Sequence, residues 1–199
     1  MGETLVAVLA GGASRRMGVD KAFVDVAGRP MIEWVLEAAE AVTDDVVVVG
    51  RRGRVAGREA AMDLLEGRHG PAAGLATALA RNGGPVVLLA CDQPWVRVET
   101  LAHLVERFDD RPVVPVDDGW PQVTCAVYPS RLALPMTAAA RRDDSIRTVL
   151  DTVDVDRVDD WASTGEDGRS WYSVDSPAAL EAGLRRFGAP RGVSSSGLV

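Results

Sequence analysis

The sequence contains few cysteines and almost no lysine. Cys91 and Cys125 each lie within an apolar run, without CxxC spacing and without a nearby histidine. This pattern argues against a disulfide framework and against a cysteine-based metal site, and it predicts buried thiols. Lys21 is the single lysine among 22 basic residues, so arginine supplies the other 21. A lysine kept against such a bias indicates a position where a compact ammonium does something that a planar guanidinium cannot.

Long hydrophobic stretches and an excess of positive charge are also missing. No stretch approaches the roughly 20 uncharged residues that a membrane span needs, and the N-terminus lacks the basic region and apolar core of a signal peptide. We therefore expect a cytoplasmic protein with no membrane partner. The net charge of −7 argues against a nucleic-acid partner, because such proteins need a basic surface that displaces counterions from phosphates.

The apolar content is sufficient for one domain. The chain has 199 residues, of which 47% are hydrophobic, and this length is too short for two full domains with a linker. We expect a single domain over residues 1–187. The polar segment 188–199 predicts a disordered tail.

Unbroken apolar runs at Thr4–Ala10, Val46–Val49 and Val86–Ala90 predict strands that are buried on both faces. Further strands of less certain direction are expected at Val113–Val116, Thr124–Tyr128 and Thr152–Val155. Helical periodicity follows Pro30, recurs around Leu101 to Phe108, and begins again at Ser176-Pro177. Strands that alternate with helices predict an α/β fold with three αβα layers and a mostly parallel central sheet.

The most informative motif is LAGGASRRMGVDK, from Leu9 to Lys21, directly after the first predicted strand. Glycines allow backbone N–H groups to approach an anion closely, and Arg15, Arg16 and Lys21 supply full positive charges. The pattern matches neither GxxxxGK[ST] nor GxGxxG, so ATP hydrolysis and dinucleotide redox chemistry lose support. The alternative is a surface turn with solvated arginines.

The second motif is LLACDQPW, in which Asp92 follows the buried run Val86–Ala90. Ligands of open α/β sheets gather at the carboxyl ends of the strands, so we expect Asp92 to face the same crevice as the first motif. A carboxylate there can hold Mg²⁺, which takes one or two carboxylates together with substrate phosphates. An Asp at a strand end can also be a helix cap or a turn former.

Four motifs together resemble the molybdenum cofactor guanylyltransferase family. They are LAGGxSxRMGxDK, GxP at Gly28–Pro30, GPxAGL at Gly70–Leu75 and CDxP at Cys91–Pro94, and the resemblance covers residues 4–187. It implies a Rossmann-like nucleotidyltransferase fold. It also implies that GMP passes from GTP to molybdopterin bearing molybdenum, giving the guanine dinucleotide cofactor and pyrophosphate.

The resemblance assigns roles to particular residues. GTP would be bound by a set drawn from the motifs and from the segment before GPxAGL: Leu9, Ala10, Gly11, Gly12, Lys21, Asp63 and Asp92. Asp92 would hold Mg²⁺, and the charges of Lys21, Arg15 and Arg16 would serve catalysis. Asp175 is a weak candidate for acceptor binding. Proteins of cofactor biosynthesis or molybdoenzyme maturation are implied as partners.

Three alternatives remain open at this point. The first is a molybdopterin cytidylyltransferase, although similar cytidylyltransferases tend to have LAAG where this chain has LAGG. The second is a guanylyltransferase with another phosphorylated acceptor, and the third is a non-catalytic nucleotide or cofactor carrier. Relatives often carry an asparagine just after the second strand, where this chain has Gly50-Arg51-Arg52, and an NxNTP segment where it has residues 173–177.

The remaining polar and aromatic residues allow two interpretations each. Arg51, Arg52, Arg54 and Arg58 could meet a polyanionic substrate or form a solvated loop. Trp161 and Trp171 could stack on a pterin or pack in the core. His69 and His103 have no sequence partner for a nucleophile–base pair, and we expect both at the surface.

Overall fold

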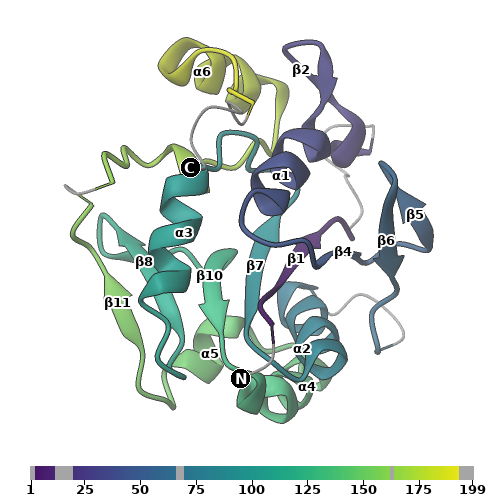
Figure 1. Cartoon of the computed structure of the whole chain (residues 1–199), viewed down its shortest axis with the longest axis vertical. Helices are drawn as coiled ribbons and strands as arrows, with labels where there is room; N and C mark the ends of the chain where they lie inside the picture. The colour runs from purple at the N-terminus through teal and green to yellow at the C-terminus, as the bar shows by residue number, and fades with distance from the viewer. Residues whose placement is uncertain (1–2, 12–19, 66–69, 162–163, 193–199) are drawn as a thin grey trace.

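The computed structural model describes residues 3–11, 20–65, 70–161 and 164–192. Within these residues a nine-stranded sheet has the order β11-β8-β10-β7-β1-β4-β6-β5, with β9 paired to β8 (Figure 1). Its strands are β1 (Leu5–Leu9), β4 (Val46–Val49), β5 (Gly53–Val55), β6 (Arg58–Ala61), β7 (Val86–Ala90), β8 (Val113–Asp117), β9 (Trp120–Pro121), β10 (Cys125–Tyr128) and β11 (Asp156–Val158). A separate hairpin joins β2 (Asp25–Val26) to β3 (Arg29–Pro30).

The central strands run parallel, as expected. β1 pairs in parallel with β4 and β7, and β4 pairs in parallel with β6. β10 is antiparallel to both β7 and β8, so β8 and its parallel neighbour β11 run in the direction of β7. The segment between β8 and β10 is too short for the crossover that a parallel connection requires, which explains the reversal at β10.

Helices cover both faces of this sheet. They are α1 (Met31–Glu40), α2 (Gly70–Asn82), α3 (Val98–Glu106), α4 (Ala133–Arg141), α5 (Ile146–Leu150) and α6 (Pro177–Phe187). Alternate residues of β7 enter different cores: Val86 and Leu88 pack with α2, α4 and α5, whereas Val87 and Leu89 pack with α1 and α3. The expected three-layer αβα arrangement is confirmed. Burial of β7 on both faces explains why its sequence is apolar without alternation.

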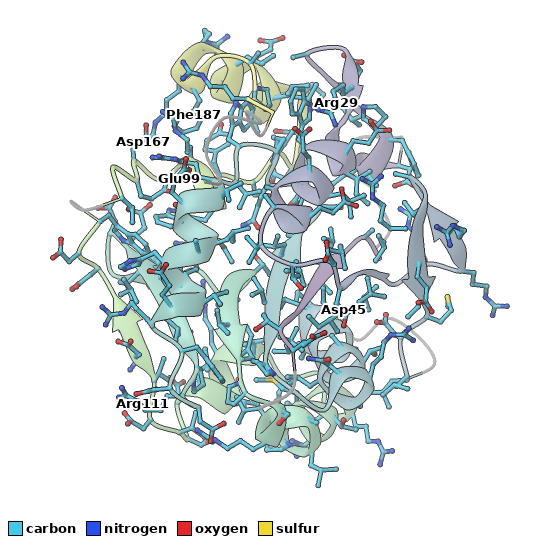
Figure 2. The ribbon with its side chains drawn as sticks, viewed as in Figure 1. Arg29, Asp45, Glu99, Arg111, Asp167 and Phe187 are labelled. Atoms are coloured by element: carbon cyan, nitrogen blue, oxygen red, sulfur yellow. The ribbon has the colours of Figure 1, made fainter. Side chains whose placement is uncertain are left out.

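A third, smaller core lies under α6 beside the β2–β3 hairpin (Figure 1). Trp95 contacts Tyr172 and Phe187 there, each with ring centroids 5.7 Å apart. Figure 2 shows Phe187 near this end of the molecule. Ser176 caps α6 by accepting a hydrogen bond from the N–H of Ala179, and Pro177 begins the helix, as its sequence predicts.

One predicted strand is displaced. The run Thr152–Val155 was expected to be extended, but the strand is β11 at Asp156–Val158. The N–H groups of Thr152 and Val153 instead donate to the carbonyls of Val149 and Leu150. These bonds finish the last turn of α5, so the apolar residues after the helix complete its end before β11 begins.

Charged side chains tie the outer loops together. Arg111, at the periphery in Figure 2, pairs with Asp109 at 2.7 Å and with Asp154 at 3.3 Å. It thereby links the segment before β8 to the segment before β11. These exposed pairs contribute little to stability.

The described part of the C-terminal segment makes a contact with the domain. The indole N–H of Trp95 donates to the carbonyl oxygen of Gly188 at 2.8 Å. Residues 193–199 lie outside the described residues, so the disordered tail stays a prediction. Across the described ranges, no helix combines the length and apolar character needed to cross a bilayer.

Candidate active site

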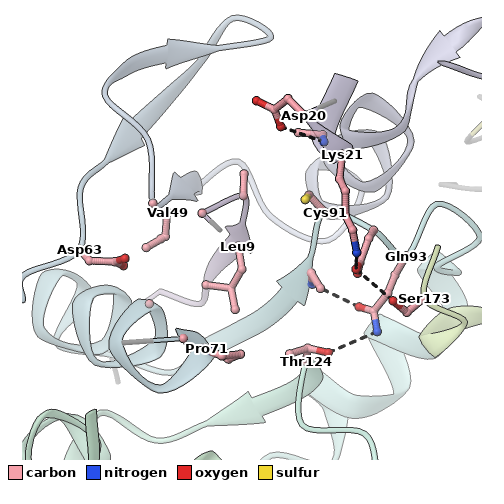
Figure 3. A pocket seen from close by; sticks show the side chains of 18 of the residues that line it. Leu9, Asp20, Lys21, Val49, Asp63, Pro71, Cys91, Gln93, Thr124 and Ser173 are labelled. Atoms are coloured by element: carbon pink, nitrogen blue, oxygen red, sulfur yellow. Dashed lines mark hydrogen bonds and ion pairs between the residues drawn. The ribbon is translucent and has the colours of Figure 1, made fainter. Parts of the chain in front are cut away.

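A cleft of about 580 Å³ opens where β1, β4 and β7 end. Leu9 pairs in register with Val49 on one side and with Ala90 on the other, so the three strands end at the same level. The loops that follow them therefore begin side by side, as the topology of an open parallel sheet dictates. Figure 3 shows Leu9 and Val49 in the wall of this cleft, with Lys21 and Gln93 across from them.

Lys21, Asp92 and Ser173 meet in the cleft (Figure 3). The ammonium Nζ of Lys21 lies 3.5 Å from Oδ2 of Asp92, and the hydroxyl of Ser173 donates to the same oxygen at 3.0 Å. The side chains of Lys21 and Asp92 are 23% and 21% exposed. The pair is thus partly shielded from water but open to a ligand.

Backbone contacts hold Asp92 in place. The N–H of Cys91 donates to the carbonyl of Leu9 at 3.0 Å, which extends the pairing of β1 and β7 up to Asp92. The carbonyl of Asp92 accepts from the N–H of Val174 at 2.8 Å, so the segment with Ser173 is attached at the same point. The side-chain oxygen of Gln93 accepts from the N–H of Ala90, closing the turn.

Lys21 begins the short 3-10 helix η1 (Lys21–Phe23), and Asp20 caps it by accepting from the N–H of Ala22 at 3.2 Å. Asp20 is also bound by Arg51, whose hydrogen bonds hold the pKa of this carboxyl below its ordinary value. Asp20 lines the cleft beside Lys21. Asp20 therefore caps the short helix whose first residue, Lys21, faces Asp92.

The wall formed by β1 and β4 is made by close backbone contact. A Cβ on Gly50, whose φ is +91°, would lie 2.5 Å from the Cα of Gly11. A Cβ on Gly74 would lie 2.4 Å from Cδ2 of Leu9. Gly11 and Gly50 thus let two loops touch, and Gly74 lets α2 approach the end of β1.

The predicted nucleotide residues converge wherever the structure describes them. Leu9, Ala10, Gly11, Lys21, Asp63 and Asp92 all line the cleft. Asp63 lies across the cleft from Lys21, on the side of Pro71 at the start of α2 (Figure 3). Gly12, Arg15, Arg16 and His69 lie outside the described residues. The individual roles of all these residues stay predictions.

The remaining candidates, Asp175 and the basic stretch from Arg51 to Arg58, do not all lie at the cleft. Asp175 precedes the cap of α6 and is not among the residues that line the cleft. The basic stretch divides: Arg51 binds Asp20 beside the cleft, whereas Arg58 binds Glu40 at the end of α1. A single charged stretch in the sequence therefore serves two different places.

The two tryptophans pack in or against the core, and His103 packs beside Trp161. Trp171 is 8% exposed and packs on Trp161 with ring centroids 5.1 Å apart, and His103 packs on Trp161 at 6.0 Å. The indole N–H of Trp171 donates to Asp117 at 2.8 Å. Core packing thus accounts for both tryptophans, although Trp171 also reaches the wall of the cleft. The expectation that His103 is a surface residue is confirmed only in part, because the residue is half-buried and its ring nitrogen Nε2 is buried.

Sequence reasoning missed a polar wall. Gln93, Gln122, Thr124 and Ser173 line the cleft. Gln93 and Ser173 lie across it from Asp63 (Figure 3). The side-chain amide of Gln93 lies 3.4 Å from the hydroxyl of Thr124, and Gln93 is only 3% exposed. The available signal was the position of Gln93 in the CDQP motif, directly after a strand that the sequence predicts to be buried. A polar side chain that is buried at such a point needs hydrogen-bond partners.

The thiol of Cys91 lies in this cleft but is not prepared for chemistry. Burial, followed by the nearby negative charge of Asp92, raises its pKa to about 12. Burial also raises the pKa of the Cys125 thiol. Both thiols therefore stay protonated near neutral pH. Cys125 is buried as predicted, whereas Cys91 lines the cleft and is only partly buried.

The family model described as the MobA-like NTP transferase domain matches residues 6–158. The chain belongs to this family. A probable molybdenum cofactor guanylyltransferase of Bacillus licheniformis is 32% identical over 185 residues, covering 87% of this chain and 93% of the relative. A probable molybdenum cofactor guanylyltransferase of Natronomonas pharaonis is 35% identical, covering 94% of this chain and 100% of the relative.

A solved structure agrees with these relatives. The molybdopterin-guanine dinucleotide biosynthesis protein A of Archaeoglobus fulgidus superposes with a TM-score of 0.79 at 28% identity, covering 92% of this chain and 97% of that one. The predicted resemblance is confirmed, and the chain is a nucleotidyltransferase.

Proposed function

We propose that the chain transfers GMP from GTP to molybdopterin bearing molybdenum, with release of pyrophosphate. The observation that carries this proposal is the meeting of Lys21, Asp92 and Ser173 at 3.5 and 3.0 Å in a cleft of about 580 Å³. Leu9 and Asp63 lie across this cleft from Lys21, Gln93 and Ser173 (Figure 3). Two ligands can therefore meet at the lysine and the carboxylate. The names of the relatives supply the identity of both ligands.

Guanine suits the end of the cleft that contains Asp63. Asp63 lines the cleft there, on the side of Pro71 at the start of α2 (Figure 3). A carboxylate accepts hydrogen bonds and donates none, and guanine offers its ring N–H and its amino group as neighbouring donors. Cytosine offers only an amino group as donor, so this end favours GTP over CTP.

The residues of the chain act by position and charge. The acceptor's terminal phosphate is already an anion, so the attack on the α-phosphorus needs no general base. The ammonium of Lys21 neutralises charge on the phosphates, and the backbone at Ala10 and Gly11 approaches them closely. Ser173 holds the carboxylate of Asp92 by its hydrogen bond. Orientation of two negatively charged reactants is the main contribution.

Mg²⁺ fits the donor set around Asp92. Lys21 and Ser173 both contact Oδ2, so Oδ1 of Asp92 remains for a cation as far as the described residues go. Those residues contain no cluster of three or more His, Cys, Asp or Glu side chains suited to a metal. A site with a single carboxylate suits Mg²⁺, which takes its other ligands from phosphates and water and, when bound, stabilises the charge that develops on the phosphates.

The direct test measures pyrophosphate release by purified protein in magnesium. GTP, CTP and ATP are each offered with molybdopterin bearing molybdenum, and we expect release with GTP well above release with the other two. Preference for CTP would assign the chain to cytidyl transfer. If pyrophosphate were released only with a different phosphorylated acceptor, that acceptor would take the place of molybdopterin in the proposed reaction. Nucleotide binding without any release would indicate a carrier.

A further inference from the structure

Arg51 joins the two ends of the sequence segment that carries the phosphate motif. Its Nε donates to the carbonyl oxygen of Ala10 at 2.8 Å, and Nη1 and Nη2 donate to Oδ2 and Oδ1 of Asp20, both at 2.5 Å. Residues 11–19 lie between Ala10 and Asp20 in the sequence. One guanidinium therefore fixes the separation of β1 from η1.

Asp20 passes this restraint on to Lys21. Its Oδ1 also caps η1 through the N–H of Ala22, and Lys21 is the first residue of that helix. At the other end of η1, the ring of Phe23 lies 5.8 Å from the guanidinium of Arg51. The short helix is thus held at both ends. The position of this helix therefore determines the 3.5 Å distance between Nζ of Lys21 and Oδ2 of Asp92.

The Arg51–Asp20 pair is too exposed to matter mainly for stability. The two side chains are 26% and 39% exposed, and ion pairs in such surroundings add little to the free energy of unfolding. What a bidentate guanidinium–carboxylate pair does provide is a fixed direction. We propose that Arg51 is a positioning residue that holds Lys21 at Asp92 through Asp20. The inference rests on the proposed function for its kinetic part only.

The chain contains a matched control pair. Arg58 also binds a carboxylate at two points, although through its side edge: Nε donates to Oε1 of Glu40 at 2.5 Å and Nη2 donates to Oε2 at 2.6 Å. The exposures of 32% and 40% are also similar. Neither residue lines the cleft. Arg58→Gln therefore removes an equivalent ion pair without touching η1.

The first test uses the fact that Lys21 is the only lysine. Trinitrobenzenesulfonate modifies Lys21 and the α-amino group, and peptide mapping measures the rate at Lys21 alone, without any nucleotide. Arg51→Gln should speed modification severalfold, because Lys21 leaves the carboxylate that now shields it. Asp20→Asn, which keeps an oxygen to cap η1, should act in the same way. In Arg58→Gln, Lys21 should be modified at the wild-type rate. Equal rates for Arg51→Gln and Arg58→Gln would overturn the proposal.

The second test is kinetic. Misplacement of the lysine by about 1 Å should lower kcat by on the order of tenfold or more in Arg51→Gln, with a smaller change in KM for GTP. Arg51→Lys keeps the charge but not the two-point geometry, so it should not restore kcat. Unfolding midpoints of all variants should stay near that of the wild type.

The last measurement combines Arg51→Gln with Asp20→Asn. If both residues act through one contact, the double variant should resemble the singles, whereas independent roles would make the losses in kcat multiply. A large rise in KM for GTP with unchanged kcat and unchanged Lys21 modification would mean that Arg51 binds the nucleotide directly, and would also overturn the proposal. The modification rate of Lys21 is measured without nucleotide. It therefore tests the positioning role of Arg51 even if the chain does not transfer GMP from GTP.

Discussion

The two halves of the cleft are built in different ways. The backbone half, formed by Gly11, Gly50 and Gly74, depends on the absence of side chains, and a Cβ on Gly50 would lie 2.5 Å from the Cα of Gly11. The side-chain half is the polar wall of Gln93, Gln122, Thr124 and Ser173. Lys21 and Asp92 line the same cleft, and Lys21 lies on the side of Gln93 and Ser173 (Figure 3).

This difference indicates how each half can change. A surface made of backbone at van der Waals contact admits no added carbon, so substitutions there act on the fold and on the nucleotide together. A surface made of polar side chains can change one group at a time. We therefore expect the backbone half to respond to mutation through stability and the side-chain half through kinetics.

The largest effect is expected at Asp92, which both Lys21 and Ser173 contact. Asp92→Asn should keep the fold but lower turnover by on the order of a hundredfold or more, because Lys21 loses its partner and a bound cation loses its anionic ligand. Steady-state rates at several magnesium concentrations would measure this. Wild-type turnover at limiting magnesium would remove Asp92 from the chemistry.

A second prediction isolates the backbone half. Gly50 and Gly53 both have positive φ, at +91° and +75°, but a Cβ on Gly53 would meet nothing within 4 Å. Gly53→Ala should therefore cost only the conformational term, about 1–2 kcal/mol of unfolding free energy. Gly50→Ala adds a clash with backbone that cannot rotate away, so its cost should be larger and GTP affinity should fall with it. Urea unfolding and GTP titration of both variants provide the comparison, and equal costs would contradict the close contact.

The smallest effect is expected in the side-chain half. Ser173→Ala removes one hydrogen bond to Oδ2 of Asp92, and loss of about 1 kcal/mol corresponds to roughly a fivefold lower rate. Stability and GTP affinity should hardly change, and Ser173→Thr, which keeps the hydroxyl, should retain most of the rate. A loss of stability as large as that of Gly50→Ala would erase the distinction between the halves.

Prediction from sequence succeeded where the relevant residues are neighbours in the chain. Unbroken apolar runs located β4 and β7 at their observed bounds, and they placed β1 to within a residue at each end. Asp92 was found because it follows a buried strand, and its approach to Lys21 was expected because strand ends of a parallel sheet meet at one edge. The same reasoning misplaced β11. The segment that was predicted as a strand begins with residues whose N–H groups bond to the last carbonyls of α5, and a short sequence run does not distinguish a helix end from a strand.

Contacts between distant segments were beyond the sequence. Ser173 reaches Asp92 across 81 positions, and Arg51 reaches Asp20 across 31. In the sequence, Arg51 and Arg58 belong to one basic stretch, and nothing in it indicates that they bind partners in different parts of the fold. Their different partners follow from the turn at β5, which returns the chain along β6 and sends Arg58 towards Glu40.

The sequence by itself determined the sheet-forming runs, the glycine-rich motif and the family, because periodicity and motif spacing are local properties of the chain. Only the tertiary structure decided which side chains share the cleft and which do not. Trp171 became part of the core, Arg51 became a link between β1 and η1, and Gln93 acquired Thr124 as a neighbour. These outcomes depend on packing between segments far apart in the sequence, and no local pattern encodes the partner of a side chain at that range.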